Sequence, residues 1–296
     1  MKKHWKVAIG ALISLTIISG ILLYFVLTEV GAFFDKTYEP IESTPQEETA
    51  SVVKTEHKKE KETGVLHVLL MGVDERINDK GRTDVLMVLE VNPNDKSTKI
   101  VSLPRDTKVK IPGKNKSTKL NHAYGSGGPS LTIQTVENLL DISIDYYVKV
   151  NMSGFEKIIS EIGDLTIDNE REFSFEGNHY PKGEITLQPE EALAYVRMRK
   201  DDPLGDMGRN NRQRKVLEAS INKLVKKHDY VGMVKLLDTI SKYLQWDIKQ
   251  SDLHDLYTNY RPALRNIESF TLPGDGKLDK DGLWYFFAEN PGEVLH

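Results

Sequence analysis

The sequence predicts a mixed α/β domain, an αβ sandwich in which helices flank a central mixed sheet. Val65 to Val73 is a continuous apolar run typical of a strand buried on both faces. Two further strand-like runs flank a turn sequence, and several later segments carry apolar residues at helical spacing. Strands and helices in such a series bury their apolar faces by packing helices against a sheet.

The first three strands are predicted from the region before residue 104. The strand at Val65–Val73 is followed by two apolar runs, Val85–Val91 and Thr98–Leu103. Between these runs lies Asn92-Pro93-Asn94-Asp95, whose residues are typical of a tight turn. We therefore expect the second and third strands to form a hairpin or to lie side by side.

Helices and strands then alternate along the chain. Helices are predicted at Pro129–Leu140 and at Met152–Ile162, where Gly163 ends the second. The run at 142–150 is predicted to be a strand, and 172–187 a hairpin. Further helices are predicted for Pro189–Tyr195, Arg209–Lys227 and Met233–Leu244.

The composition excludes several classes of function. The chain has 296 residues, 39% of them hydrophobic, which is enough for a substantial core. With 40 Lys and Arg against 44 Asp and Glu, the net charge is −4, which argues against nucleic acid as a partner. No cysteine is present, so disulfides, zinc-thiolate sites and thiol nucleophiles are excluded.

The N-terminal region predicts a membrane anchor. Residues 7–27 form an uncharged apolar run that is long enough to cross the hydrocarbon layer as a helix. Lysines precede the run and acidic residues follow it, so residues 1–6 are expected in the cytoplasm and the rest outside, as in a single-pass type II protein of the cell membrane. A cleaved signal peptide is the alternative, but the run is longer than a typical signal core.

The segment from 28 to 64 is rich in Glu, Lys, Thr and Pro and has little to bury. It is predicted to be a mobile extracytoplasmic linker. The folded, catalytic domain is then expected to comprise residues 65–296.

Arginines gather between Arg197 and Leu217, where five of them accompany three aspartates. In the helix predicted from Arg209, stepping back along the apolar face from Leu217 reaches Gln213 and then Arg209. Arg197 follows Leu193 by one turn on the face expected to meet the core. Two helix ends are therefore predicted to direct guanidinium groups toward one place.

Two interpretations of this arginine cluster remain open. Asp201, Asp202 and Asp206 would balance the arginines if the cluster were an internal network of salt bridges that holds a loop. Alternatively, the cluster binds phosphate, because a planar guanidinium group binds phosphate oxygens bidentately and the first turn of a helix offers free N–H groups. The number of arginines favours a pyrophosphate.

Charged residues also lie at the ends of the first three strands. Asp74 directly follows the first strand, and Asp84 with Arg82 directly precedes the second, so the two carboxylates are expected at one edge of the sheet. One or two carboxylates together with substrate phosphates suit Mg²⁺. Arg105 follows the third strand and is expected at the same edge, although it could equally pair with Asp106.

Five blocks of sequence in this order resemble the LytR–CpsA–Psr family, the cell-wall glycopolymer transferases of Gram-positive bacteria. The resemblance also extends to the basic N-terminus, the single span and the linker. The blocks are LLMGVDER, RTDVLMV, VSLPRDTKV, KLNHAYGSGGP and YVRMRKDDPLGDMGRNNRQR.

The resemblance implies roles for particular residues. Asp74 and Asp84 match the aspartates that bind Mg²⁺, or Mn²⁺ in its place, or assist catalysis, and Arg105 shares the catalytic role with Asp84. Asp206 matches a supporting residue of the same site. The pyrophosphate of a polyprenyl lipid is expected to be bound by Arg82, Arg105, Arg197, Arg209 and Gln213.

The implied reaction moves an anionic glycopolymer, such as wall teichoic acid, from undecaprenyl pyrophosphate to a sugar hydroxyl of peptidoglycan. A phosphodiester forms and the lipid monophosphate leaves. The family fold also implies a hydrophobic cleft for the lipid tail. Asp84 is our candidate for the base that accepts the proton of the hydroxyl.

Two rival functions are kept. A hydrolase would cleave the same pyrophosphoryl lipid with water, whereas a non-catalytic protein would bind the lipid-linked glycan and act as a regulator.

Ser126 lies outside a nucleophile-elbow sequence and is assigned to a flexible loop near the cleft. His122 has no second ligand in sight and is assigned a structural or surface role.

Overall fold

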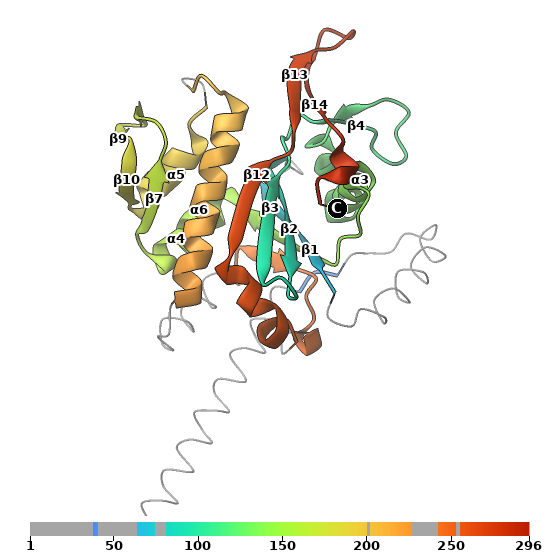
Figure 1. The fold of residues 1–296 in the computed structure, drawn as a ribbon. Coiled ribbons are helices and arrows are strands. Elements are labelled where there is room, and N and C mark those ends of the chain that lie inside the picture. The colour runs from blue at the N-terminus through green and yellow to red at the C-terminus, as the bar shows by residue number, and fades with distance from the viewer. Residues whose placement is uncertain are drawn as a thin grey trace, which may run out of the picture.

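A six-stranded sheet forms the centre of the computed structural model, which describes residues 38–40, 64–74, 81–199, 202–226, 242–252 and 255–295 (Figure 1). The strand order is β11-β6-β1-β2-β3-β12. Pairs β1–β6 and β3–β12 are parallel and the other pairs are antiparallel, so the sheet is mixed as expected. The strands are β1 (Leu66–Val73), β2 (Thr83–Asn92), β3 (Ser97–Ser102), β6 (Tyr146–Asn151), β11 (Leu244–Trp246) and β12 (Ile267–Thr271).

The predicted hairpin of the second and third strands is confirmed. Strands β2 and β3 pair antiparallel from Met87↔Ser102 to Asn92↔Ser97. The side chain of Asn92 holds the turn, because its Nδ2 donates to a carboxylate oxygen of Asp95 at 2.7 Å and its Oδ1 accepts from the backbone N–H of Asn94 at 3.0 Å.

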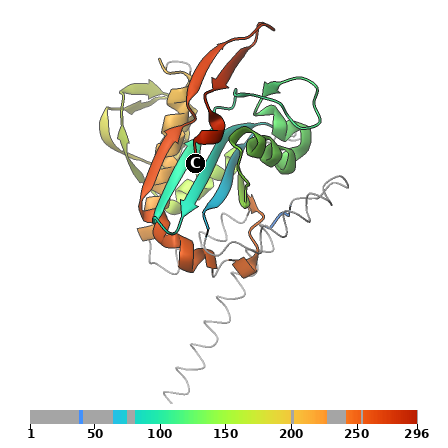
Figure 2. The same ribbon diagram turned by 45° about the vertical axis from the view of Figure 1, so that its right-hand side comes forward.

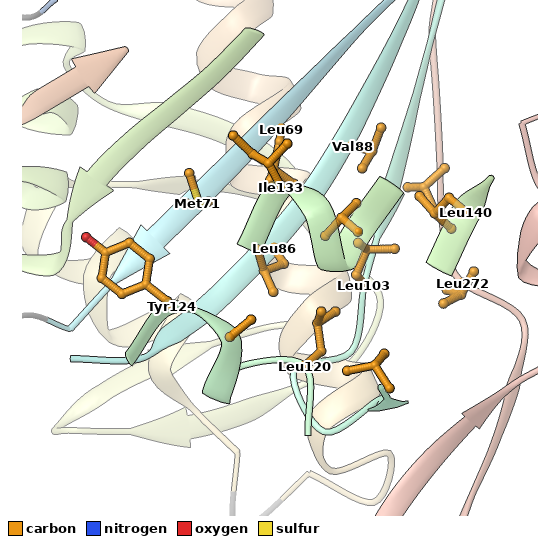
Figure 3. Packing of buried hydrophobic residues seen from close by; sticks show 14 of the residues in the cluster. Leu69, Met71, Leu86, Val88, Leu103, Leu120, Tyr124, Ile133, Leu140 and Leu272 are labelled. Carbon is orange, nitrogen blue, oxygen red and sulfur yellow. The ribbon is translucent and has the colours of Figure 1, made fainter. Parts of the chain in front are cut away.

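Helix α3 (His122–Leu140) covers one face of the sheet (Figure 1). It buries Ile133, Val136 and Leu140 against Leu69 and Val88 of the strands, and Figure 3 shows this packing from close by. The helix predicted from 129 to 140 is therefore confirmed. The preceding residues are helical as well, and the helix is interrupted at Gly127 and Gly128.

The expectation of a flexible loop around Ser126 is therefore wrong in part. Ser126 lies in a helical turn before the kink, where the positive φ of Gly128 (64°) allows the chain to change direction. The backbone of the two glycines is not helical, so α3 consists of two helical segments joined at this kink.

Helices α4 (Met152–Ile162), α5 (Pro189–Arg197) and α6 (Asp206–Lys226) lie on the opposite side of the sheet from α3 (Figure 1). Asn151 caps α4 by accepting from the Gly154 N–H at 2.7 Å, and Gly163 ends it with φ of 86°. Pro189 opens α5 behind a reciprocal cap of Gln188 and Glu191. The predictions of these three helices are confirmed, with α6 beginning three residues earlier than expected.

The hairpin predicted at 172–187 is only half correct. Strands β8 (Phe173–Phe175) and β9 (Asn178–Tyr180) pair with each other. Strand β10 (Gly183–Leu187) pairs instead with β7 (Leu165–Asn169), which the sequence reading did not include. Leu165 and Ile167 of β7 are buried and alternate with exposed residues. This alternation fixes the register in which β10 pairs with β7.

Several short elements, most of them toward the C-terminus, were not predicted. They are short or at sheet edges, so their periodicity is weak. They comprise β4 (Lys108–Val109), β5 (Thr118–Lys119), β13 (Gly274–Leu278), β14 (Trp284–Ala288), β12, and short helical turns at Gln250–Asp252, Leu256–Tyr260, Arg261–Arg265 and Pro291–Glu293.

The N-terminal segment contributes a short contact at the edge of the sheet. Tyr38 forms a parallel bridge with Trp246 of β11, and the Glu39 N–H donates to the Trp246 carbonyl at 2.7 Å. The prediction of a mobile linker is therefore wrong at residues 38–40, because backbone hydrogen bonds attach them to the sheet.

Two predicted helices fall wholly or largely outside the described residues. None of the helices within the described ranges is long and apolar enough to cross a membrane. The predicted span at 7–27 lies outside these ranges, as does most of the helix predicted at 233–244. Its last residue, Leu244, begins β11 and is therefore extended.

A cross-strand ion cluster at the far end of the sheet provides a test of stability. Glu90 is 7% exposed; its Oε1 lies 3.0 Å from Lys99 Nζ and its Oε2 3.5 Å from His67 Nε2, both on neighbouring strands. Burial raises the pKa of Glu90, but the hydrogen bonds with His67 and Lys99 outweigh this effect and lower it overall. The ionised carboxylate therefore stabilises the fold above its unfolded pKa.

We expect Glu90→Gln to reduce the free energy of unfolding at pH 7 by about 1–3 kcal/mol. The deficit should shrink as the pH falls below about 4.3, because the wild-type carboxylate then takes up a proton. Urea unfolding of both proteins at several pH values measures the difference. A deficit that stays constant down to pH 3 would contradict the assignment.

Candidate functional site

The charged residues predicted at the strand ends lie at one end of the sheet. Asp84 is at the start of β2 and Arg105 follows β3, whereas Asp74 follows β1. The Asp74 N–H donates to the Arg82 carbonyl at 3.1 Å, which continues the antiparallel pairing of β1 and β2 beyond Val73. The expected shared edge of the sheet is therefore present.

Arg105 joins this edge of the sheet to helix α6. Its Nη1 donates to Oδ1 of Asp84 at 2.5 Å, and its Nε lies 3.9 Å from Oδ1 of Asp206, the first residue of α6. The same Asp206 oxygen lies 2.5 Å from Arg209 Nη2 and 3.5 Å from Arg199 Nε. The guanidinium groups of Arg105, Arg199 and Arg209 thus surround the carboxylate of Asp206. Asp84 supplies the second carboxylate of the cluster, which pairs with Arg105.

The cluster leaves buried polar atoms without hydrogen-bond partners. Both carboxylate oxygens of Asp206 lack a hydrogen bond, as do Nε of Arg105 and Nε and Nη2 of Arg209. The ion pairs are close, but their angles do not meet those of a hydrogen bond. Unsatisfied buried groups of this kind cost about 1–3 kcal/mol each, so the site is poised for an additional charged partner.

The guanidinium groups differ in how well the protein satisfies them. Burial lowers the pKa of Arg105, but the hydrogen bond to Asp84 and the charge of Asp206 outweigh it and raise the pKa overall. Burial also lowers the pKa of Arg209; Asp206 opposes this effect, but neighbouring Arg105 lowers the pKa further. Of Arg105 and Arg209, Arg209 is therefore the one whose charge the protein stabilises less.

Two other arginines of the cluster are structural. Arg212 donates to Asp202 at 2.5 Å, to the Tyr195 carbonyl at 3.0 Å and to the Met198 carbonyl at 2.5 Å, and so holds the loop between α5 and α6. Arg214 donates to Thr271 of β12 at 2.6 Å. The interpretation as an internal network of salt bridges holds for Arg212, which pairs with Asp202, whereas Arg214 bonds to neutral side chains. Arg209 and Arg199 pair with Asp206.

The structure leaves two of the proposed pyrophosphate ligands at the surface. Arg197 is the last residue of α5 and is exposed, so the expectation that it meets the core is wrong. Leu193, from which that face was extrapolated, lies at the margin of the buried set at 9% exposure. Arg82 is also exposed. The pKa of His122 is lowered mainly by the burial of its imidazole and, to a smaller extent, by the positive charge of Arg82. Within the described ranges no ion pair links either arginine to Asp206.

His122 begins α3, and its Nδ1 lies 2.7 Å from the Thr118 hydroxyl. This contact agrees with the structural role expected for it.

An apolar cavity of about 250 Å³ lies between the sheet and helices α4 and α6. Gln213 lines it, with Leu217, Ile221 and Leu224 following on the same helix. This is the apolar face predicted for the helix. The other lining residues are Leu70, Met71, Gly72, Val85, Met87, Val148, Val150, Phe155, Ile158, Ile159, Ile162, Val196, Ser220 and Leu244.

The sequence reading missed three polar residues that belong to this region. Arg199 follows α5 in irregular backbone, where helical spacing gives no guide to its direction. Asn121 donates its N–H to the Arg105 carbonyl at 3.0 Å, and its buried Oδ1 has no hydrogen-bond partner; Nδ2 of Asn210 is likewise unpaired. Both asparagines lie within the sequence blocks that resemble the family, and only this position could have indicated that they belong to the site.

Asp74 and Asp84 suit a metal that takes one or two protein carboxylates. In the part of the chain that the structure describes, no group of three or more His, Asp or Glu side chains is close enough to hold an ion. The two aspartates nonetheless stand at neighbouring ends of the paired strands β1 and β2, and Asp84 contacts Arg105 of the cluster. This donor set fits Mg²⁺ that is shared with phosphate oxygens.

Comparison with known proteins gives matches over most of the chain. The LytR_cpsA_psr family matches residues 30–293. The polyisoprenyl-teichoic acid–peptidoglycan teichoic acid transferase TagU of Bacillus mycoides (strain KBAB4) is 39% identical over 292 residues, which cover 97% of this chain and 93% of the relative.

Solved structures show the same fold. TagU of B. subtilis is 35% identical with a TM-score of 0.62, over 78% of this chain and 94% of that one. TagT bound to LIIa-WTA is 32% identical with a TM-score of 0.65, over 78% and 88% of the two chains. The chain therefore belongs to the LytR–CpsA–Psr family.

Proposed function

We propose that the chain is a polyisoprenyl-teichoic acid–peptidoglycan teichoic acid transferase. One face of helix α6 carries this proposal. Asp206, Arg209, Gln213, Leu217 and Ile221 follow one another at intervals of three or four residues, so they share that face. Arg209, in the first turn, has guanidinium nitrogens without hydrogen bonds, and Gln213, Leu217 and Ile221, which follow it on this face, line the apolar cavity. A lipid with a pyrophosphate head and a hydrocarbon tail matches both ends.

The pyrophosphate would take the guanidinium groups that the protein leaves unsatisfied. Nε of Arg209 and Nε of Arg105 are buried and have no hydrogen-bond acceptor, and Nη2 of Arg209 lies close to Asp206 without the angles of a hydrogen bond. Guanidinium–phosphate hydrogen bonds are charge-assisted and often bidentate, so an anion there recovers the cost of burying these donors. Three arginines against two aspartates leave room for a further negative charge.

The polyprenyl tail would occupy the cavity beside Gln213. The lining is almost wholly apolar, and each buried methylene of the lipid contributes about 0.8 kcal/mol. Because the cavity and Arg209 share α6, the head and the first isoprene units would be held together by one rigid element.

In the proposed reaction, the acceptor sugar hydroxyl attacks the phosphorus that carries the glycopolymer. A new P–O bond forms, the bond to the bridging oxygen breaks, and lipid monophosphate leaves with the released electron pair. Phosphoryl transfer demands mainly positioning and stabilisation of charge on oxygen. Arg209, which is buried, and Arg105, which is partly buried, supply that charge.

Asp84 is proposed to accept the hydroxyl proton. Its Oδ1 is held by Arg105, and its side chain is 31% exposed, so the carboxylate is oriented while it remains accessible to an acceptor. Asp74 and Asp84 would hold Mg²⁺, whose charge offsets that of the phosphate oxygens when it is bound. The protein would act outside the cell, anchored by residues 7–27 with the N-terminus in the cytoplasm.

The direct test uses the full chain in lipid nanodiscs. It is incubated with a pyrophosphoryl-linked lipid glycan, Mg²⁺ and peptidoglycan oligomers, and the products are identified by mass spectrometry. A phosphodiester-linked product that disappears in Arg105→Ala would establish the transferase. Free phosphorylated glycan would instead indicate a hydrolase, and lipid binding without turnover a non-catalytic protein.

Arg209 and Arg212 provide a matched pair of substitutions. We expect Arg209→Ala to lower kcat/KM by roughly 100-fold or more. It should destabilise the fold less than Arg212→Ala does, because Asp206 still lies within 4 Å of Arg105 and Arg199. Arg212→Ala should lower the free energy of unfolding by about 3–5 kcal/mol, because it leaves the buried carboxylate of Asp202 unpaired. Equal destabilisation by both would argue against a ligand-binding role for Arg209.

The cavity can be tested by filling it. We expect Leu217→Trp to raise the KM for a long polyprenyl donor at least tenfold and to affect a donor with two isoprene units much less. Leu217→Met conserves volume and is the matched control, with kinetics close to wild type. A tryptophan variant with an unchanged KM for the long donor would place the tail elsewhere.

The roles proposed for the two aspartates predict different responses to metal. Asp74→Asn should raise the Mg²⁺ concentration required for half-maximal transfer, so that activity recovers when more metal is added. Asp84→Asn should lower kcat at every Mg²⁺ concentration, because it also removes the base. Full activity of Asp84→Asn would refute the base, and full activity of the wild type in chelator would refute the metal requirement.

A further inference from the structure

A β-hairpin projects beyond the end of the sheet that carries the charged cluster (Figures 1 and 2). Strands β13 and β14 pair antiparallel from Gly274↔Ala288 to Leu278↔Trp284. β13 follows β12, which is parallel to β3 and pairs with it up to Thr271↔Ser102. The hairpin therefore leaves the sheet at the same end as Arg105, which follows β3.

The base of the hairpin is attached to the Arg105 loop. The Phe286 N–H donates to the carbonyl of Asp106 at 3.0 Å, and Phe286 forms a bridge with Thr107. Nearer the tip, Lys108 forms an ion pair with Asp279. The hairpin is thus braced against the segment that positions the proposed catalytic arginine.

The tip presents large apolar side chains to solvent. Leu278 is 70% exposed, Leu283 54% and Trp284 42%. Single exposed apolar residues are ordinary, but three within seven residues on a projecting tip are typical of a binding surface.

The indole of Trp284 lies across a glycine on the neighbouring strand. A Cβ atom built on Gly276 would lie 2.0 Å from a ring carbon of Trp284, so only glycine leaves room for the ring. Gly276 pairs with Phe286, which places it diagonally opposite Trp284. One part of the indole is therefore supported by backbone while the rest, 42% of the residue, remains open to solvent.

We propose that this tip is a docking platform for the glycan strand of the peptidoglycan acceptor. A pyranose ring has an apolar face that stacks on an indole, and its hydroxyls bond to charged side chains such as that of the exposed Lys280. The proposal rests on the transferase function proposed above. The platform would hold one part of the glycan while another sugar of the strand reaches Asp84.

The charges at the tip favour a glycan over a lipid surface. Asp279 and Asp281 lie between Leu278 and Trp284, and both are fixed there, by the Lys108 ion pair and by the Tyr285 hydroxyl, which donates to Asp281 at 2.9 Å. Insertion of this tip into a bilayer would carry both carboxylates into it, which is unfavourable. A neutral, hydrated sugar face imposes no such cost.

The kinetic test uses the full chain in nanodiscs with soluble glycan-strand oligomers as acceptor. We expect Trp284→Ala to raise the acceptor KM about tenfold while the KM for the lipid donor is unchanged, and Trp284→Phe to restore most of the loss. The double variant Leu278→Ser/Leu283→Ser should also raise the acceptor KM. An unchanged acceptor KM in a transferring Trp284→Ala protein overturns the platform and leaves the proposed function intact.

A binding measurement separates the two proposals and tests the membrane. In a Trp5→Phe/Trp246→Phe background, Trp284 is the remaining tryptophan. A blue shift of its emission on adding glycan oligomers supports the platform even if no transfer is detected, in which case only the transferase fails. Quenching by brominated lipids of the nanodisc, with no response to glycan, would identify a bilayer contact and overturn the platform.

Discussion

The structure around the site depends on one carboxylate, that of Asp206. Its Oδ1 lies within 4 Å of guanidinium nitrogens from three separate segments: the loop after β3, the chain after α5 and the first turn of α6. Without this negative charge, Arg105, Arg199 and Arg209 would repel one another, most strongly at the buried Arg209. Yet the carboxylate does not satisfy them fully, because Nε of Arg105 and Nε and Nη2 of Arg209 make no hydrogen bond of good geometry. Asp206 therefore assembles the arginines and leaves their donors available.

This incomplete satisfaction contrasts with the treatment of Arg212 nearby. Arg212 is buried to the same degree as Arg209, at 7% and 8% exposure, but its guanidinium group meets a carboxylate and two backbone carbonyls. The same residue type on the same helix thus serves two purposes that are distinguished by hydrogen bonding and not by burial. A satisfied guanidinium group holds the loop between α5 and α6, whereas an unsatisfied one retains the capacity to bind an anion.

Much of the fold followed from local patterns, and the failures have physical causes. Long periodic runs such as 65–73 and 209–226 were interpreted correctly because their buried faces repeat over several turns or residues. The pairing of β10 was not predicted because its partner is β7, from which it is separated in the sequence by the hairpin of β8 and β9. For the site, helical spacing placed Arg209 and Gln213 correctly but failed at Arg197, which ends its helix, and gave no information on Arg199 beyond it. The split between structural and unsatisfied arginines depends on where backbone carbonyls lie, which no spacing reveals.

The position of the site at the junction of apolar and charged elements follows from how α6 is placed. Its apolar residues pack toward β1, β2 and β6, but helix and sheet do not close on each other, and a cavity remains. Its first turn extends to the end of the sheet, where β2 begins and β3 ends, so charge is concentrated where the core stops. An amphiphile can therefore place its tail within the packed layers and its head at the edge without exposing either to the wrong environment. The hairpin of β13 and β14 leaves the sheet at that same end. An acceptor that approaches the head group from outside would therefore meet this hairpin beside the arginines, on the side remote from the tail.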